Sequence, residues 1–218
     1  MIDKRISAIV DEIPESNTLA DIGCDHGLTS FYAIKSKKAQ KVIATDVSQM
    51  SLEKAKSLFT ERGLIDFADF RCGNGLKVLQ DGEADVVVIT GMGGREIISI
   101  LDDAKRQNAT FILSPQSEVP DVRIWLIENG YSINTDKMIE SAGKFYVIIK
   151  AQKGCTDYSE TEIKYGRDNI AKRNEDFIKW IDFELNRIDR IIKTSDSENT
   201  RQKFIEYAEE LNNIKNKR

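Results

Sequence analysis

The sequence predicts an α/β protein with a doubly wound, mostly parallel seven-stranded sheet, followed by a C-terminal α-helical hairpin. Strand patterns and helix patterns alternate along most of the chain, which is typical of a parallel sheet covered by helices on both faces. The last two strand patterns are separated by only a few residues, so they are expected to pair antiparallel. After residue 153 the strand patterns stop and helical periodicity takes over. We therefore expect two parts, residues 1–153 and residues 154–218.

Length and composition agree with this division. Of the 218 residues, 40% are hydrophobic and 31% are charged, so the chain can bury a core and keep a solvated surface. It contains no run of 18 apolar residues, and its first residues lack the apolar stretch of a secretory signal. The three cysteines form no CxxC pair, which argues against a disulfide framework or a zinc site. We expect a cytoplasmic protein without membrane association and without a bound metal.

In the first half of the chain, separate sequence patterns predict each helix and strand. Isoleucines recur at helical spacing through residues 1–13, and Pro14 ends that helix, which we expect to pack beside the first strand. Apolar runs then alternate with helical segments, the second of which ends at Gly63. The predicted strands are 19–24, 41–46 and 67–71, and the predicted helices are 28–37 and 51–62, with Ser48 or Ser51 as the N-cap.

The second half supplies the centre and the far edge of the sheet. Residues 85–90 form a continuous β-branched run, as expected of a central strand buried on both faces. The predicted elements after it are a helix over 95–105, a strand over 109–113, a helix over 119–129, and strands over 131–138 and 144–152. The short link between the last two strands cannot hold a crossover helix. Five parallel strands completed by an antiparallel hairpin form the Rossmann-like sheet of class I methyltransferases.

The C-terminal part shows two helical stripes. Core-spaced side chains, Asn174 among them, advance in steps of three and four from Ala171 to Ile192, and a shorter stripe runs from Phe204 to Ile214. A polar break at 195–197 separates the stripes, so we expect an antiparallel, coiled-coil-like helical hairpin. The two helices could simply bury each other, or the hairpin could serve as an arm that grips a large substrate.

The most informative segment is the turn Asp21-Ile22-Gly23-Cys24-Asp25-His26-Gly27, which follows an apolar strand. Closely spaced glycines let the backbone approach a nucleoside, and a carboxylate after the next strand, here Asp46, accepts hydrogen bonds from ribose hydroxyls. Asp25 stands where dinucleotide-binding enzymes keep a glycine, and its charge would repel a pyrophosphate but suit an ammonium group. The pattern therefore favours S-adenosylmethionine over NAD. The predicted cofactor-binding residues of this region are Asp21, Gly23, Asp25, His26, Gly27, Asp46 and Val47.

Three further loops end on the same edge of the sheet, where ligands bind in open α/β folds. Asn74 can read the adenine ring with its amide, although Asn-Gly pairs also make ordinary turns. The glycines of the loop Thr90-Gly91-Met92-Gly93-Gly94 allow close approach to a cofactor and to an incoming base. We assign cofactor binding to Asn74, Gly75, Gly91 and Met92, and substrate binding to Gly93, Gly94, Pro115 and Gln116.

Two of these side chains have competing interpretations. Met92 either lines the binding pocket or fills the core. His26, the only histidine, either transfers a proton or makes a hydrogen bond at the start of the following helix, and the second role is favoured.

The net charge of −4 is unfavourable for a nucleic-acid-binding protein, because phosphate contacts require Lys and Arg. Four basic residues nevertheless cluster in the C-terminal part, with only Asp168 among them. They could bind phosphates, or they could form the solvated face of a helix. We assign substrate binding to Lys164, Arg167, Lys172 and Arg173.

The chain resembles the bacterial tRNA adenine-N1 methyltransferases that act on adenine 22 in the D-arm. Two motifs carry this resemblance, the Asp-Ile-Gly-x-Asp-His turn at 21–27 and the Gly-Met-Gly-Gly loop at 91–94. Similar segments occur at 113–116, 123–126 and 143–146, and the resemblance extends through the helical tail. The chain departs from the family at Leu28-Thr29-Ser30, where many relatives carry Tyr-Leu-Pro.

The resemblance implies methyl transfer from S-adenosylmethionine to N1 of an adenine in tRNA. Adenine N1 has a lone pair and no proton, so the reaction depends on positioning and needs no strong general base. Asp25, His26 and Met92 are the predicted catalytic residues, each in a positioning role. The alternatives are an S-adenosylmethionine-dependent methyltransferase for another acceptor, a nucleotide-dependent oxidoreductase, and a non-catalytic RNA- or protein-binding module. We expect a monomer.

Overall fold

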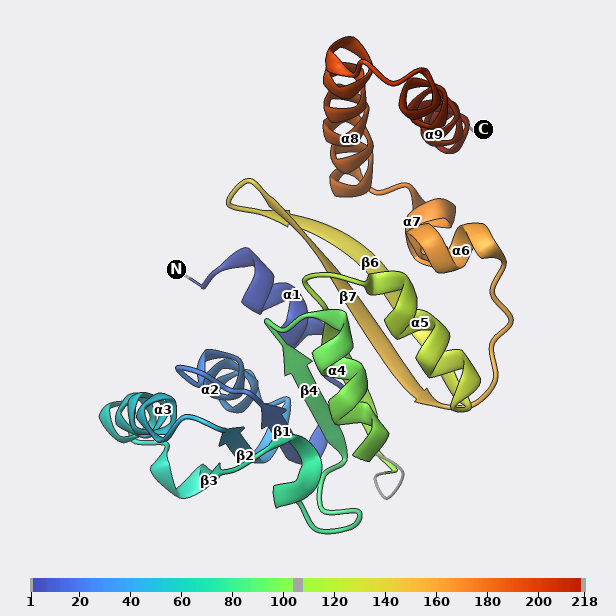
Figure 1. The fold of residues 1–218 in the computed structure, drawn as a ribbon. Helices are drawn as coiled ribbons and strands as arrows, with labels where there is room; N and C mark the ends of the chain where they lie inside the picture. Colours follow the sequence, from blue (N-terminus) through green and yellow to red (C-terminus); the bar gives the residue numbers. More distant parts are fainter. Residues whose placement is uncertain (1, 104–107, 217–218) are drawn as a thin grey trace.

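A single seven-stranded sheet forms the centre of the protein (Figure 1), whose computed structural model describes residues 2–103 and 108–216. The strand order is β3-β2-β1-β4-β5-β7-β6, and β1 to β5 run parallel, whereas β7 is antiparallel to both of its neighbours. The predicted fold class is therefore confirmed, including the antiparallel hairpin at the edge. The strands are β1 (Ser16–Ile22), β2 (Ala39–Asp46), β3 (Ala68–Cys72), β4 (Val86–Thr90), β5 (Thr110–Ser114), β6 (Tyr131–Ser141) and β7 (Lys144–Lys153).

Helices cover both faces of the sheet (Figure 1). One face carries α1 (Lys4–Glu12), α2 (Leu28–Lys35) and α3 (Gln49–Glu61), and the other carries α4 (Gly94–Leu101) and α5 (Val119–Glu128). Two single-turn 3₁₀ helices, η1 (Ile65–Phe67) and η2 (Gly75–Val78), flank β3. This is the double layer of helices that the alternating pattern predicted.

The central strand β4 shows why a continuous β-branched run belongs in the middle of the sheet. Its residues Val86 to Ile89 are all at most 1% exposed. Because successive side chains of a strand point to opposite faces, Val86 and Val88 join the core under α1 and α2. Val87 and Ile89 join the core under α4 and α5. Burial on both faces removes the polar alternation that a half-exposed strand would need.

Several boundaries differ from the sequence expectation for local reasons. The first strand ends at Ile22 and not at residue 24, because Gly23 has φ +69° and turns the chain. The helix predicted over 51–62 begins earlier, at Gln49. The Ser48 hydroxyl accepts a hydrogen bond from the Ser51 N–H and so caps this helix. The predicted helix over 95–105 is observed as α4, and its last two predicted residues lie outside the described residues.

The placement of the N-terminal helix corrects the expectation that it lies beside the first strand. Helix α1 contacts mainly α2 and the hairpin strands β6 and β7. Its buried side chains Ile9, Val10 and Ile13 share a core with Ile139 and Ile148 of that hairpin. The helix therefore packs over the part of the sheet where the parallel strands give way to the antiparallel hairpin.

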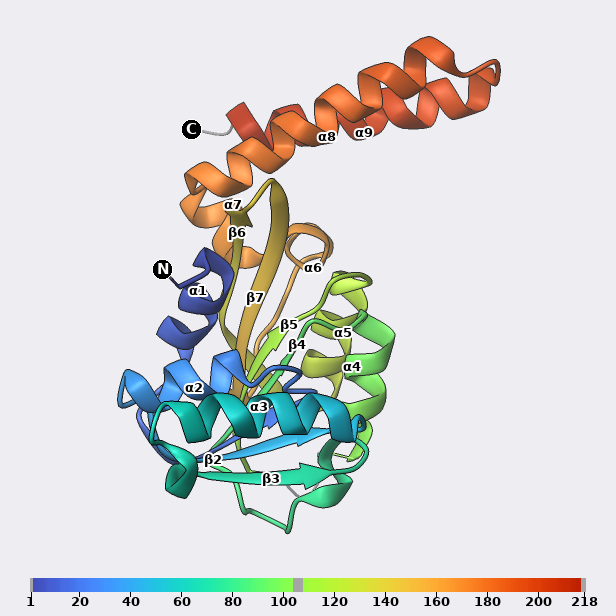
Figure 2. The same ribbon diagram turned by 90° about the vertical axis from the view of Figure 1, so that its left-hand side faces the viewer.

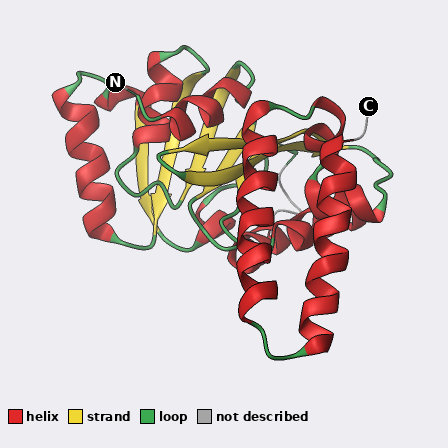
Figure 3. Cartoon of the chain, turned by 90° about the horizontal axis from the view of Figure 1, so that it is seen from above, coloured by secondary structure: helices red, strands yellow, loops and turns green. Residues whose placement is uncertain are grey.

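The C-terminal part contains four helices, α6 (Glu160–Tyr165), α7 (Arg167–Lys172), α8 (Glu175–Thr194) and α9 (Glu198–Asn216). The long pair α8 and α9 forms the predicted antiparallel hairpin, which projects beyond the sheet (Figures 2 and 3). Ile181 and Ile188 of α8 are buried in one cluster with Leu211 and Ile214 of α9. The stripe prediction was wrong at its start, because Ala171 lies in α7 and Asn174 is the N-cap of α8.

A buried ion pair joins the C-terminal helices to the sheet. The Arg123 guanidinium of α5 donates to both oxygens of Asp136 in β6 at 2.8 Å, and the two side chains are 2% and 1% exposed. Arg123 Nη1 also donates to the Ile163 carbonyl at the end of α6. The cation thus pairs with a carboxylate and with a helix C-terminus, both of which stabilise it away from water.

Helix α7 covers the free edge of β6. The Asp136 N–H donates to the Asp168 carboxylate at 3.0 Å, and the Met138 N–H donates to the Asn169 side-chain oxygen at 2.7 Å. These side chains replace a neighbouring strand, so the edge backbone is paired although the sheet has ended. The sheet, α7 and the start of the helical hairpin therefore form one continuous packed unit.

The buried pair gives the first prediction. The substitution Asp136→Ala leaves the Arg123 guanidinium buried without its anion, so we expect the free energy of unfolding to fall by about 3–5 kcal/mol in urea denaturation. The matched control is Asp189→Ala, which breaks the exposed pair with Lys193 and should change that free energy by less than about 1 kcal/mol. Equal effects of the two substitutions would contradict the role assigned to the pair.

Candidate functional site

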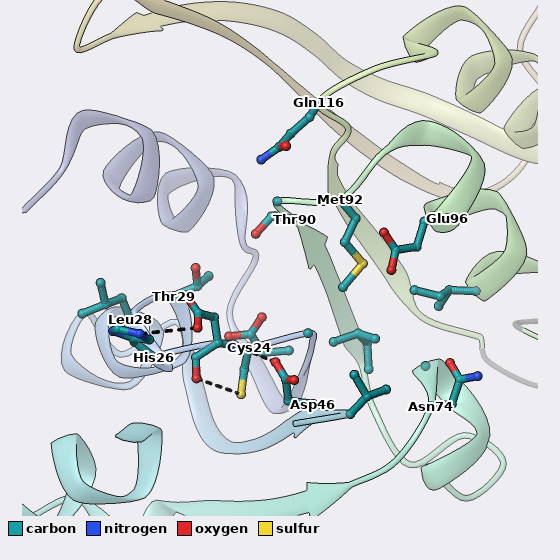
Figure 4. Close-up of a pocket in the computed structure, with 18 of the residues that line it drawn as sticks. Cys24, His26, Leu28, Thr29, Asp46, Asn74, Thr90, Met92, Glu96 and Gln116 are labelled. Atoms are coloured by element: carbon teal, nitrogen blue, oxygen red, sulfur yellow. Dashed lines mark hydrogen bonds and ion pairs between the residues drawn. The ribbon is translucent and has the colours of Figure 1, made fainter. Parts of the chain in front are cut away.

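A cavity of about 490 Å³ opens at the carboxyl ends of the parallel strands (Figure 4). Its walls come from the loops after β1, β2, β3, β4 and β5, together with parts of α1 and α4. Strand β1 lies between β2 and β4 in the sheet, so the loops that follow these three strands meet at one point. The structure therefore gathers at one edge the segments that the sequence pattern selected.

The turn after β1 is fixed by the end of β2. The N–H groups of Gly23 and Cys24 both donate to the Thr45 carbonyl, at 2.8 and 2.9 Å. The Asp25 N–H donates to one oxygen of Asp46 at 3.0 Å, and the Ser48 N–H donates to the other at 2.9 Å. Asp46 thus shapes the turn and the start of α3, while its side chain also lines the cavity (Figure 4).

Asp21 is a buried carboxylate in the wall of the cavity. One of its oxygens accepts hydrogen bonds from the Ser30 N–H and the Ser30 hydroxyl, at 3.2 and 2.7 Å. Burial raises the pKa of Asp21, the two hydrogen bonds from Ser30 lower it and the negative charge of Asp46 raises it, and the net result is a pKa of about 6. An ionised Asp21 is consequently a strong attractor for a cationic group of a ligand.

The loop after β4 packs tightly against its neighbours. A Cβ added to Gly23 would lie 2.0 Å from the Met92 terminal methyl carbon, so the glycine makes room for the methionine side chain. The Met92 carbonyl accepts a hydrogen bond from the Gln116 N–H at 2.9 Å, which ties this loop to the loop after β5. Met92 both lines the cavity and packs against the core, so both interpretations of this residue hold.

Of the residues predicted in the loops at this edge, four do not line the cavity, namely Gly27, Gly93, Gly94 and Pro115. Gly27 and Gly94 have a structural role. Gly27, at φ +68°, is the N-cap residue of α2. A Cβ on Gly94 would lie 2.6 Å from the Ser117 carbonyl oxygen, so this glycine allows two loops to meet behind the cavity. The predicted residues that do line it are Asp21, Gly23, Asp25, His26, Asp46, Val47, Asn74, Gly75, Gly91, Met92 and Gln116.

His26 lies at the exposed rim and does not act as a helix cap. Helix α2 begins at Leu28, and its N-cap Gly27 makes no side-chain cap hydrogen bond, which corrects the favoured interpretation of this histidine. His26 Nε2 lies 3.5 Å from an Asp25 oxygen, and their side chains are 54% and 75% exposed. Both side chains are therefore free to meet a molecule that approaches the cavity from outside.

Sequence reasoning missed several residues in the wall. Arg5 and Ile6 come from α1, and Glu96 and Ile100 come from α4. The signals for these residues were weak, because helix spacing identifies a buried face but not the ligand that a helix end approaches. The wall also contains Ile22, Cys24, Leu28, Thr29, Gly73 and Thr90, which lie close in sequence to residues that were predicted.

The four basic residues assigned to substrate binding have partners within the chain. Lys164 pairs with Glu210, and Arg167 pairs with Glu162 at 2.7 Å. Lys172 pairs with Asp168 at 3.1 Å, while Arg173 donates to the Lys215 carbonyl. The contacts of Lys164, Arg167 and Arg173 link different C-terminal helices. The Lys172 pair lies within α7, and the Lys172 side chain, 67% exposed, remains open to solvent.

Within 2–103 and 108–216, no group of three or more His, Cys, Asp or Glu side chains is arranged to hold a metal ion. In the same ranges, no helix is long and apolar enough to cross a membrane.

Comparisons with known proteins show which family the chain resembles. A family model described as a methyltransferase domain matches residues 2–149. The tRNA (adenine(22)-N(1))-methyltransferase of Bacillus subtilis (strain 168) is 29% identical, with 98% of this chain and 95% of that protein covered. The solved structure of the B. subtilis m1A22 tRNA methyltransferase TrmK has a TM-score of 0.84 at 27% identity, with 99% of each chain covered.

A second solved structure is that of M. capricolum TrmK in complex with S-adenosyl-homocysteine. It has a TM-score of 0.82 at 25% identity, and the alignment covers 98% of this chain and 96% of that one. These matches confirm the family resemblance that the turn after β1 and the loop after β4 predicted.

Asp21 gives a prediction about stability and pH. Its pKa in the folded state, about 6, lies above its ordinary value of 3.8, so the folded state binds more protons between these values and loses stability as the pH rises through them. The substitution Asp21→Asn removes the charge, so at pH 8 it should stabilise the protein without ligand by up to roughly 3 kcal/mol. The gain should fade as the pH falls to about 4. Chemical denaturation across pH 4–8 measures it, and a gain independent of pH would contradict the assignment.

Proposed function

The chain belongs to the methyltransferase domain family, and from this premise we propose that it transfers a methyl group from S-adenosylmethionine to N1 of adenine 22 in tRNA. One observation carries the proposal. Asp21, Asp46, Asn74 and Gly91, which follow or end four different strands, line a single cavity at the carboxyl edge of the sheet. In this proposal Asp46, Asn74 and Asp21 each face a different group of the cofactor, and Gly91 lets the backbone approach it.

The residues of the cavity fit S-adenosylmethionine. Each Asp46 oxygen accepts one backbone N–H and keeps a free lone pair, so the carboxylate can accept from ribose hydroxyls. Asn74 and the side chain of Ile100 offer an amide and an apolar wall for adenine. Asp21, buried in the wall, offers a negative charge for the ammonium group of the methionine moiety. This replaces the sequence-based expectation for Asp25, whose side chain is 75% exposed at the rim. A volume of about 490 Å³ lies within the range of small-ligand pockets.

The reaction depends on the positions of the two reacting groups more than on acid–base catalysis. S-adenosylmethionine supplies an electrophilic methyl group on a sulfonium sulfur. The protein must hold adenine N1 in line with that methyl, which is catalysis by proximity. The Gln116 side chain points into the cavity from the loop after β5 (Figure 4), where its amide can hydrogen-bond to the edge of a purine. Asp25, at the exposed rim, offsets the positive charge that N1 methylation leaves on the base.

The acceptor is supported by the B. subtilis relative, which carries this activity in its name and matches nearly the whole of this chain. A base within a folded RNA must leave its stack before its N1 can reach the cavity. The helical hairpin formed by α8 and α9 projects beyond the sheet (Figure 2), as an arm that could hold a large folded RNA. In this proposal residues 1–153 carry the chemistry, residues 154–218 grip the tRNA, and the enzyme works as a cytoplasmic monomer without a metal.

Cofactor binding gives a prediction with a matched control. The substitution Gly23→Ala drives the Met92 side chain from its place, so we expect the affinity for S-adenosylhomocysteine to fall at least about tenfold in calorimetry. Gly63→Ala introduces a side chain at a similar φ, +66° against +69°, with no neighbour within 4 Å, and it should leave the affinity unchanged.

The same calorimetric measurement of affinity for S-adenosylhomocysteine tests substitutions of Asp46 and His26. Asp46→Ala should nearly abolish binding, because the turn and the ribose lose the same carboxylate, whereas His26→Ala should have a modest effect. If Gly23→Ala and Asp46→Ala both bound S-adenosylhomocysteine as tightly as the unaltered protein, the location of the site would be contradicted.

The reaction itself is tested with unmodified tRNA. We expect the protein to transfer labelled methyl groups to a tRNA transcript and to produce N1-methyladenosine at position 22, as detected by nucleoside mass analysis. The control is the same transcript with guanine at position 22, which should remain unlabelled. Methylation of a different nucleoside would support the alternative of another acceptor. Cofactor binding without transfer to any tRNA would support the non-catalytic alternative.

A further inference from the structure

Arg5 is the only lysine or arginine among the described residues that line the cavity. Its guanidinium lies close to the loop after β4, because a Cβ added to Gly91 would be 3.7 Å from Arg5 Nη2. The Arg5 Nε atom is buried and has no hydrogen-bond partner in the described part of the chain. A buried donor without a partner is destabilising in the protein alone, which indicates that a bound group supplies the acceptor.

Contacts other than an ion pair with a carboxylate hold Arg5 in place. The Asp3 carboxylate caps α1 by accepting a hydrogen bond from the Arg5 N–H at 2.7 Å, which fixes the backbone at this position. The guanidinium lies 5.1 Å from the centre of the Tyr146 ring of β7, an attractive contact that leaves its N–H groups free. Other arginines of the chain, such as Arg71 and Arg123, pair with carboxylates. No such ion pair joins Arg5 to a described residue.

Arg5 lies at the end of the cavity that is formed by the segments after β1 and β4. Strands β1 and β4 are neighbours, with Ile22 opposite Ile89, so the loop that contains Gly91 lies beside the turn that follows Asp21. Asn74 and Ile100 come instead from the loop after β3 and from α4. The end near β1 and β4 thus offers the buried carboxylate of Asp21 and the guanidinium of Arg5. Opposite charges on one wall complement a zwitterionic α-amino acid group.

We infer that Arg5 binds the carboxylate of the methionine moiety of S-adenosylmethionine, while Asp21 faces its ammonium group. The inference rests on the proposed function, since it assigns one group of that cofactor. A planar guanidinium can donate two parallel hydrogen bonds to a carboxylate, and such charged bonds are stronger than neutral ones. Arg5 is therefore a binding residue for the cofactor, contributed by a helix outside the glycine-rich turn.

The experiment is a binding cycle with two ligands and two proteins. The ligands are S-adenosylhomocysteine and its decarboxylated analogue S-adenosyl-3-thiopropylamine, which keeps the ammonium group. The proteins are the unaltered chain and Arg5→Met. We expect the substitution to weaken binding of S-adenosylhomocysteine by about tenfold to a hundredfold, the range of a hydrogen bond to a charged group. Binding of the decarboxylated analogue should change by less than about twofold, because it has no carboxylate to lose.

Two controls separate binding from folding and from general charge effects. Lys4→Met removes the same charge from the neighbouring position of α1, whose side chain does not line the cavity, and it should leave both affinities unchanged. Arg5→Lys keeps the charge but not the paired geometry, so it should give an intermediate loss for S-adenosylhomocysteine alone. Thermal unfolding of each variant shows whether it has kept its fold.

The outcomes are distinct. An equal loss for both ligands would overturn the inference, because Arg5 would then act on the fold of the site and not on the carboxylate. Unchanged binding of both ligands together with weaker binding of tRNA would also overturn it and assign Arg5 to an RNA phosphate. Failure of the unaltered protein to bind S-adenosylhomocysteine would instead contradict the proposed function.

Discussion

The carboxylate of Asp46 is the contact on which the rest of the site depends. It accepts hydrogen bonds from the backbone of Asp25 and of Ser48, and so it fixes the glycine-rich turn and the start of α3 at once. The adjacent Thr45 carbonyl holds Gly23 and Cys24 in the same way. The residue assigned to ribose therefore also builds the turn that lets a ligand approach the sheet. Local folding and ligand recognition share one side chain, which is a form of preorganisation.

A second constraint places the helical arm relative to that site. The buried pair of Arg123 and Asp136 connects α5, β6 and the end of α6, while α7 covers the free edge of β6. A buried pair of this kind is a weak source of net stability, but its geometry is specific because breaking it leaves an isolated buried charge. The hydrophobic core also runs without interruption from the sheet into α8. An arm attached in this way has a fixed orientation relative to the cavity, as the proposed binding of tRNA requires.

The sequence predicted the elements whose signals are local or periodic. Three such predictions are confirmed by the structure. The β-branched run forms the central strand β4, the short link joins the antiparallel strands β6 and β7, and the two stripes form the helices α8 and α9. The predicted site residues that line the cavity follow parallel strands that end at the same edge. What the sequence did not predict depends on contacts between distant segments. The position of α1, the entry of Arg5 into the cavity wall and the pairing of Lys164 with Glu210 are of this kind.

The central claim is that the nucleoside of the cofactor lies where β1 and β2 end, with its ribose on Asp46. A crystal structure of the protein grown with S-adenosylhomocysteine tests this claim most directly. The account predicts ribose hydroxyls within hydrogen-bond distance of the Asp46 carboxylate and the adenine ring beside Asn74. Electron density for the nucleoside at any other place on the protein, with Asp46 facing only solvent, would contradict it.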